Sequence, residues 1–300
     1  MDRREFLKLA ALTGAGLSMP AALNLIAEAA ETTLPPDLVI AHGASPEKIV
    51  VAAIDGMGGI KKFVSRGDIV VIKPNMGWDR IPEQAGNTNP DVVAAVVKLC
   101  FEAGAKKVRV FDRPVNDPRR CFVQSGIAPA AAALGANVDF VDDRKFKDMV
   151  INGTALKSWP LYTEIFEADK VINIPIAKHH GLAKLTMSMK NWMGVMGGER
   201  RQIHQKLDES LVDLSRKIKP TLTILDAVRI LTANGPQGGN IADVKKLDTV
   251  IVGVDQVAID SYGATLFGMR GSDLGYVTLG HKFGMGQMDL NKVRIKKINV

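Results

Sequence analysis

Residues 169–181 read Asp-Lys-Val-Ile-Asn-Ile-Pro-Ile-Ala-Lys-His-His-Gly. Val171, Ile172 and Ile174 make the first half a short apolar run, which predicts a buried strand over 169–174. Polar side chains follow it within a few residues, at Lys178-His179-His180. In open α/β sheets, ligands bind beyond the carboxyl ends of the strands. The stretch therefore predicts a strand of the sheet and a candidate functional site beyond the carboxyl end of that strand.

Similar strands and intervening helices occur on both sides of this stretch. The run Ile69-Val70-Val71-Ile72 is continuously apolar and β-branched, which is typical of a strand covered on both faces. Alternating strands and helices indicate βαβ units, and hence an α/β fold with a mainly parallel sheet and helices on both faces. The other predicted helices are one at 45–55 that resumes after a glycine break to about 65, one that starts at 89 and is ended by Gly104, one at 127–134, one or two over 199–217, and one at 256–267. The other predicted strands are at 107–112, 138–141, 221–226, 247–252 and 293–300, the last an edge strand.

One segment breaks the βαβ pattern. Asn152-Gly153 lies between two short apolar runs, and Asn-Gly is the commonest sequence of a tight β-hairpin turn. We therefore expect a small antiparallel hairpin inserted over 143–160.

The N-terminus has the features of an export signal. Arg3-Arg4 precedes Phe6-Leu7-Lys8, a weakly apolar stretch follows, and Ala27-Glu28-Ala29 offers a small-residue cleavage site. Paired arginines in this setting resemble a twin-arginine (Tat) signal, which implies the Tat export machinery as a partner and a periplasmic or otherwise exported protein. We expect residues 1–29 to be the signal, 30–44 a linker and 45–300 one α/β domain. The apolar stretch contains Gly14 and Pro20, so the mature protein is not expected to be integral to a membrane.

Composition narrows the class of ligand. The chain of 300 residues carries a net charge of +7, but its Lys and Arg are interleaved with Asp and Glu, and it has three Trp and three Tyr. This pattern gives no support for nucleic-acid binding, whereas a basic surface suits a small anionic ligand. Two cysteines, Cys100 and Cys121, supply no iron–sulfur cluster motif.

Chemistry-bearing side chains follow several of the predicted strands. Parallel strands would gather them in one crevice, with lysines binding negative charge, a histidine moving a proton and carboxylates orienting the ligand or acting as a base. The candidate catalytic residues are His179, His180 and Asp112. The candidate ligand-binding residues are Lys73, Asn75, Lys178, Lys190, Asn191, Asp226 and Asp260.

The adjacent histidines limit the metal hypothesis. On an extended segment His179 and His180 point in opposite directions, so one of them faces a common site. A neutral imidazole with a carboxylate such as Asp112 or Asp226 would suit a divalent metal, but no His-x-His or HExxH spacing is present. The cofactor is therefore left open.

The ordered set of these pieces resembles the family known as domain of unknown function 362 (DUF362), over roughly residues 45–270. The resemblance implies an α/β domain and no settled activity. Some members look like fusions with ferredoxin-like, cysteine-rich segments, and this chain has none. The matching pieces are Val71-Ile72-Lys73-Pro74-Asn75, Thr88-Asn89-Pro90, Gly104-Ala105, Asp112, Asn173-Ile174-Pro175, Lys178, His180, Leu185-Thr186, Lys190-Asn191, Gly194, Asp226, Gly235-Pro236, Gly239 and Asp255–Asp260.

Two hypotheses of function follow. The first is an exported enzyme that acts on a small anionic substrate, and it requires Lys73, Asp112, His180 and Lys190 to meet in one pocket. The second is a non-catalytic periplasmic binding protein or an accessory subunit of a redox complex. A distant relation to nickel-pincer racemases is a weaker third idea, based on fold-level analogy alone.

Overall fold

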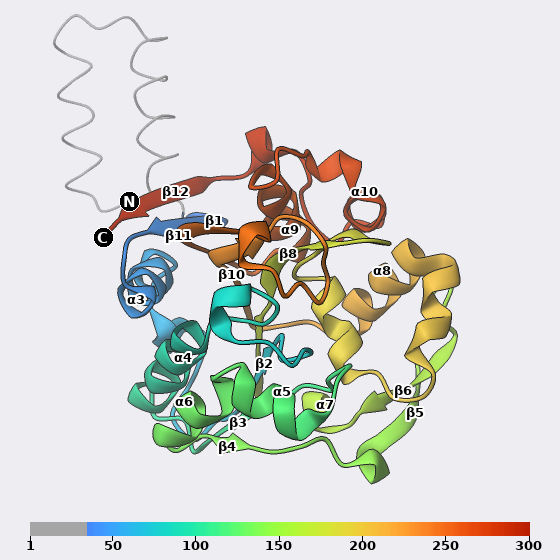
Figure 1. Cartoon of the computed structure of the whole chain (residues 1–300), viewed down its shortest axis with the longest axis horizontal. Coiled ribbons are helices and arrows are strands. Elements are labelled where there is room, and N and C mark those ends of the chain that lie inside the picture. Colours follow the sequence, from blue (N-terminus) through green and yellow to red (C-terminus); the bar gives the residue numbers. More distant parts are fainter. Residues whose placement is uncertain (1–34) are drawn as a thin grey trace, which may run out of the picture. The chain divides into compact units, whose positions relative to one another are not determined.

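A ten-stranded sheet forms the centre of the computed structural model, which describes residues 35–300 (Figure 1). Residues 36–300 make up one compact unit. The strands lie in the order β12 (Ile295–Asn299), β1 (Leu38–His42), β11 (Val244–Gly253), β10 (Leu222–Leu231), β7 (Lys170–Ile174), β2 (Ile69–Pro74), β3 (Lys107–Val110) and β4 (Asn137–Val138). Beside this row, β8 (Ile176–His180) pairs with β10 and with β9 (Lys184–Thr186).

Most strand pairs are parallel. Parallel pairing joins β10 to β7 and β8, β7 to β2, β2 to β3, β3 to β4, and β1 to β12. The pairs β1–β11, β10–β11 and β8–β9 are antiparallel. The predicted α/β class with a mainly parallel sheet is confirmed, and the antiparallel pairs lie towards the β11 side and at the β8–β9 extension.

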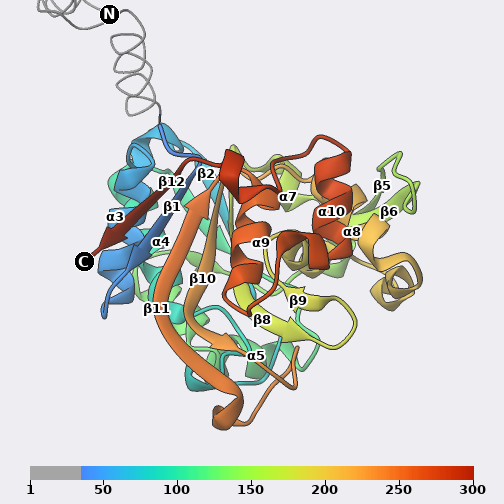
Figure 2. The same ribbon diagram turned by 90° about the horizontal axis from the view of Figure 1, so that it is seen from above.

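Helices cover both faces of the sheet (Figure 2). One face packs against α3 (Pro46–Gly56), α4 (Pro90–Glu102), α5 (Pro118–Gln124) and α6 (Ile127–Ala133), and the other against α7 (Glu164–Glu167), α8 (Leu207–Lys217), α9 (Gln256–Thr265) and α10 (Gly275–Lys282). The short 3-10 helices are η1 (Ile60–Lys62), η2 (Pro82–Gln84), η3 (Asp143–Lys145), η4 (Lys190–Val195), η5 (Arg200–Lys206), η6 (Ile241–Asp243), η7 (Gly271–Asp273) and η8 (Leu290–Lys292).

Strand β2 shows why both faces need covering. Val70 and Ile72 are buried in the core on the α3–α4 side, while Val71 is buried in the core on the opposite side. Alternate residues of a strand point to opposite faces, so a continuous apolar run can be buried only between two layers of helices. The prediction for 69–73 is confirmed.

The predicted N-cap residues of α3 and α4 are confirmed. The Ser45 side chain accepts a hydrogen bond from the Lys48 backbone N–H at 3.4 Å, and Asn89 accepts one from Asp91 at 2.9 Å. Side-chain acceptors of this kind satisfy N–H groups that have no partner inside the helix.

The predicted linker over 30–44 is wrong from Leu38 onward. Residues Leu38–His42 form β1, which pairs with β11 on one side and with β12 on the other, and four of its five residues are buried. The domain therefore begins before residue 45. The predicted signal over 1–29 lies outside the described residues.

Strand β10 is longer than predicted. It continues past 226 to Leu231, with an irregularity in its pairing to β11 between Ala227 and Arg229. Asp226 therefore lies inside a strand rather than at its carboxyl end. Pro175 likewise separates β7 from β8 without ending the extended chain, so Lys178 and its neighbours lie on a strand.

The predicted hairpin is present as β5 (Phe146–Val150) and β6 (Ser158–Tyr162), which pair antiparallel. Its connection wraps around a carboxylate from α8: Asp213 accepts hydrogen bonds from the backbone N–H groups of three successive residues, Thr154, Ala155 and Leu156. A Cβ at Gly153 would overlap that carboxylate. The glycine is therefore required by this close approach, while Asn152 takes the left-handed conformation, with φ of 55°.

Candidate functional site

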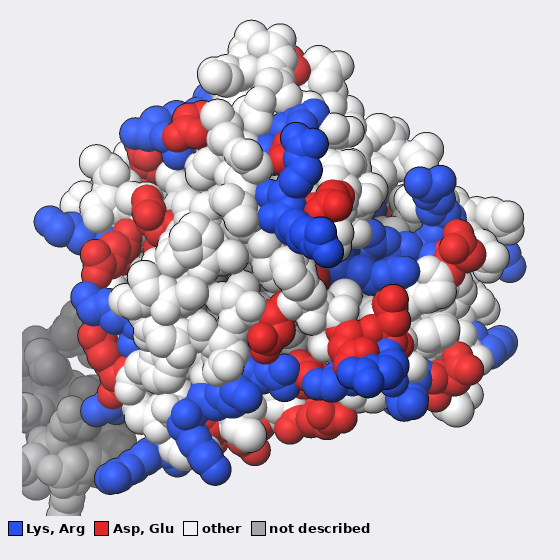
Figure 3. Space-filling view, turned by 60° about the horizontal axis from the view of Figure 1, so that its bottom comes forward, with Lys and Arg blue, Asp and Glu red and all other residues white. Residues whose placement is uncertain are grey.

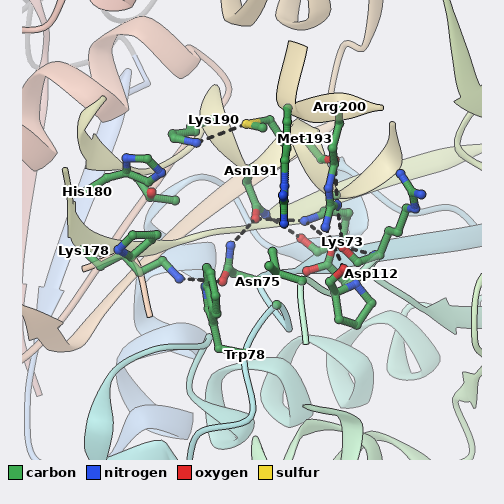
Figure 4. A pocket seen from close by; sticks show the side chains of 18 of the residues that line it. Lys73, Asn75, Trp78, Asp112, Lys178, His180, Lys190, Asn191, Met193 and Arg200 are labelled. Carbon is green, nitrogen blue, oxygen red and sulfur yellow. Dashed lines mark hydrogen bonds and ion pairs between the residues drawn. The ribbon is translucent and has the colours of Figure 1, made fainter. Parts of the chain in front are cut away.

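A cavity of about 490 Å³ opens at the carboxyl ends of β2 and β3 and beside β8 (Figure 4). Lys73, Asp112, His180 and Lys190 all line it, together with Asn75, Lys178 and Asn191. Seven of the residues singled out from the sequence are thus brought together. Strands β2 and β8, the loop after β3, and η4 supply most of them.

A continuous hydrogen-bonded chain of side chains runs along this cavity. Lys178 Nζ donates to Asn75 Oδ1 at 2.9 Å, and Asn75 Nδ2 donates to Asn191 Oδ1 at 3.0 Å. Lys73 Nζ donates to the same Asn191 oxygen at 2.9 Å. Figure 4 shows Asn75 and Asn191 between Lys178 on one side and Lys73 with Asp112 on the other. The two asparagines therefore fix the positions of two lysines.

Lys73 and Asp112 form a buried ion pair. Lys73 Nζ lies 2.9 Å from Asp112 Oδ1, and both side chains are at most 3% exposed. Asp112 also accepts hydrogen bonds from the Met76 and Arg113 backbone N–H groups. Burial lowers the pKa of Lys73, an effect that the neighbouring carboxylate opposes. Both groups are already paired, so the role of a free base predicted for Asp112 does not fit, and the ion pair instead links β2 to the loop after β3.

Lys178 and Lys190 are a different case. Both are buried, and neither has a carboxylate within ion-pairing distance in the part of the chain that the structure describes. Burial lowers the pKa of Lys190 to about 7, with the Arg200 guanidinium adding to the effect. Burial, followed by repulsion from Lys190, lowers the pKa of Lys178 well below its usual value. When protonated, each amine is therefore a buried charge without a counter-charge among the described residues, which is costly.

The two histidines lie on opposite sides of β8, as predicted. His180 lines the cavity, and its Nδ1 accepts hydrogen bonds from the backbone N–H groups of Leu182 and Ala183. A backbone N–H donates only to an unprotonated ring nitrogen, so the proton of His180 is on Nε2. Burial, then the two lysine charges, lower its pKa to about 3. His180 is therefore a neutral hydrogen-bond donor at physiological pH.

His179 does not line this cavity; it lines a second one, whose wall also includes His180. Its Nδ1 accepts a hydrogen bond from the Gly235 backbone N–H at 3.0 Å. The catalytic role predicted for His179 is therefore not supported by its position. Its observed contact holds the loop that carries Pro236, which does line the main cavity.

Asp226 and Asp260 do not line the cavity, contrary to the ligand-binding role predicted for them. Asp226 accepts hydrogen bonds from the Asn89 and Val228 backbone N–H groups and so ties the start of α4 to β10. Asp260, on α9, accepts from Ser188 and Met189, just before η4. Burial raises the pKa of Asp226 to about 6 and that of Asp260 to about 7. In this structure both carboxylates bind backbone N–H groups and not the cavity.

The sequence pattern missed the arginines of the site. Cationic side chains of the lining outnumber acidic ones six to two: Lys73, Arg113, Lys178, Lys190, Arg200 and Arg201 against Asp112 and Glu199. Figure 3 shows Lys and Arg side chains gathered around a recess in one face of the molecule. Arg200 donates to the backbone carbonyls of Arg113, Met193 and Pro114, and has no acidic partner among the described residues. The break at Gly197-Gly198 before the arginine pair was the one local signal.

A second missed group is Thr186. Thr186 is 4% exposed and lines the cavity, and its hydroxyl has no hydrogen-bond partner among residues 35–300. Buried hydroxyls are normally satisfied, so this one is available to a ligand.

Within residues 35–300 no three His, Cys, Asp or Glu side chains are grouped so that they could hold a metal ion. No helix in that range is both long and apolar enough to span a bilayer.

Comparisons with known proteins identify a family. The family described as "Domain of unknown function (DUF362)" matches residues 70–265. A thylakoid-associated protein of Synechocystis sp. is 30% identical over 216 residues, which cover 69% of this chain and 65% of that protein. The chain thus spans less than two thirds of this relative's length.

Two solved structures are also similar. A Thermotoga maritima protein has a TM-score of 0.45 and 10% identity, over 75% of this chain and 60% of its own. The lactate racemase apoprotein of Thermoanaerobacterium thermosaccharolyticum has a TM-score of 0.40 and 12% identity, over 70% and 53%. Since the DUF362 match extends over well more than half of its residues, this protein belongs to the DUF362 family.

Proposed function

We propose that this protein binds a small anionic ligand in the cavity between β2, β3 and β8, and acts on it by acid–base chemistry at Lys190. The observation that carries the proposal is the pair of buried lysines, Lys178 and Lys190, which face one cavity without a carboxylate partner among the described residues. An anion bound there would supply the missing negative charge.

The neighbouring groups support this assignment of roles. Lys178 keeps two oxygen acceptors, Asn75 Oδ1 and the Gly86 carbonyl at 2.6 Å, and its ammonium lies over the Trp78 ring at 5.8 Å. These contacts favour a positive charge that holds the anion. The Nε2–H group of neutral His180 and the Thr186 hydroxyl add neutral donors. Lys190, with a pKa of about 7, can exchange a proton near neutral pH.

Anion binding by the purified protein tests the proposal directly. We expect sulfate, pyrophosphate and small dicarboxylates, compared by isothermal titration calorimetry, to include ligands that bind with 1:1 stoichiometry. Lys178→Met should weaken binding about 10- to 100-fold, because it removes a charged hydrogen-bond donor. Lys245→Met removes the same charge from an exposed position on β11 and serves as the control. Equal losses in the two variants, or no binding by any anion, would contradict the proposal.

The pH dependence of binding tests the role of Lys190. Sulfate does not titrate between pH 6 and 9, so its affinity reports on the protein. We expect the affinity to be greatest below pH 7, where Lys190 is protonated in the free protein, and to fall by up to about 10-fold per pH unit above it. Lys190→Met should reduce this slope. An affinity that stays constant or rises from pH 6 to 9 would exclude a contact between Lys190 and the anion.

Export is a separate part of the proposal, and it rests on the sequence around Arg3-Arg4. Replacing both arginines by lysine should abolish appearance of the shortened protein in the periplasmic fraction, as followed by fractionation and immunoblotting. Unchanged processing in this variant would argue against the twin-arginine route.

A further inference from the structure

We propose that Lys190 is also a nucleophile, which forms an imine with the carbonyl carbon of the ligand. The natural ligand would then be a small carbonyl compound that carries an anionic group, such as an oxo acid. This inference rests on the anion site proposed above and assigns a chemical class to what enters it.

Three lysines line the cavity, and they differ in the acceptors that surround their amines. An amine attacks a carbonyl through its lone pair, so an ammonium that is fixed by good acceptors does not react. Lys73 Nζ is held by the Pro74 carbonyl, Asn191 Oδ1 and the Asp112 carboxylate. Lys178 Nζ is held by Asn75 Oδ1 and the Gly86 carbonyl. In both lysines these acceptors help to retain the proton and so oppose the effect of burial, which lowers the pKa of each amine.

Lys190 has no such acceptors. Among residues 35–300, the one hydrogen-bond partner of its Nζ is Met193 Sδ, at 3.1 Å. A thioether sulfur is a weak acceptor and does little to retain the proton. Figure 4 shows this contact at the upper side of the cavity, with Lys178 and His180 to one side and Arg200 to the other. The Lys190 amine is thus buried, flanked by cations and free to become neutral, which is how reactive lysines are produced.

Other side chains of the cavity could bind the anionic group of the ligand and its carbonyl oxygen. Lys178 and Arg200 can hold an anionic group without a competing carboxylate. The Nε2–H group of His180 and the unpartnered Thr186 hydroxyl are donors for a carbonyl oxygen. These two donors lie on β8 and β9, and η4, which carries Lys190, begins four residues after Thr186.

The reaction balances without any further reagent. The Nζ lone pair of neutral Lys190 forms a bond to the carbonyl carbon; the nitrogen then loses one proton and the carbonyl oxygen takes one up, which gives a neutral carbinolamine. The hydroxyl takes up a second proton and leaves as water while the C=N bond forms, and loss of the remaining proton from the nitrogen gives the imine. The net change is amine plus carbonyl to imine plus water.

Reductive trapping tests the inference. The full chain is incubated with glyoxylate or pyruvate and sodium cyanoborohydride, and adducts are located by peptide mass spectrometry. We expect one adduct per chain, on Lys190, forming at least about 10-fold faster at pH 7 than on the exposed Lys245. The rate of labelling at Lys190 should rise up to about pH 7 and then level off. Excess sulfate should suppress the adduct on Lys190.

Two variants keep the outcomes distinct. Lys190→Arg keeps the positive charge, so it should still bind sulfate but lose the specific adduct. Lys178→Met leaves the Lys190 amine in place but weakens binding of the ligand's anionic group, so it should slow the labelling of Lys190. Sulfate binding without preferential labelling of Lys190 would overturn the imine and leave the anion site standing. Labelling of Lys190 that sulfate does not suppress would overturn the link between the imine and that site. Absence of both sulfate binding and labelling would overturn both proposals.

Discussion

Gly194→Ala is expected to lower the free energy of unfolding by about 3–5 kcal/mol, the range found when a buried ion pair is broken. A Cβ at this position would overlap Asp112 Oδ1 and lie 2.5 Å from Lys73 Nζ. Gly194 also accepts a backbone hydrogen bond from Arg113 at 3.0 Å, so the chain at η4 cannot move away without losing that contact. The methyl group must therefore displace the ion pair.

Urea denaturation at pH 7, followed by circular dichroism, measures this effect. Gly181→Ala is the matched control, because nothing lies within 4 Å of a Cβ built there. This control should change the free energy of unfolding by less than about 1 kcal/mol. If both substitutions had the same small effect, the pair would not be held as closely as the geometry indicates.

Asp112→Asn should destabilise the protein by a similar amount, about 3–5 kcal/mol, because it leaves the buried Lys73 ammonium without its counter-charge. It also turns an amide N–H₂ towards one of two backbone donors, those of Met76 and Arg113. Lys73→Met should cost less, since the Asp112 carboxylate keeps both of those N–H groups.

The double variant Lys73→Met/Asp112→Asn separates the pair from its surroundings. Its loss of stability should be smaller than the sum of the two single losses, with a coupling of about 1–3 kcal/mol between the two side chains. Additive effects within about 0.5 kcal/mol would mean that the two charges do not depend on one another.

Those parts of the fold that depend on local chemistry could be predicted from the sequence. The caps at Ser45 and Asn89 depend on contacts within a few residues. The run 69–73 has distant partners, but its unbroken series of β-branched residues indicates by itself a strand that is buried on both faces. Strand β1 could not be found this way, because its burial comes from β11 and β12, more than 200 residues further along the chain. The continuation of β10 beyond Asp226 depends in the same way on pairing with β8 and β11.

The candidate site was predictable in outline for a related reason. Parallel strands end on the same side of a sheet, so Lys73, Asp112 and the Lys190 segment were expected to meet. Which carboxylates remain free was not predictable. Asp226 and Asp260 are occupied by backbone N–H groups that only the folded chain brings to them. The arginines of η5 reach the cavity from a segment whose sequence indicates an ordinary helix.

The two-residue repeat of β8 has a consequence for how this segment can change over evolutionary time. Lys178 and His180 face the cavity while His179, between them, faces away. Inserting or deleting one residue between Pro175 and Lys178 would turn Lys178 and His180 away from the cavity and turn His179 towards it. Related proteins that retain the cavity should therefore tolerate substitutions here far more readily than changes in length.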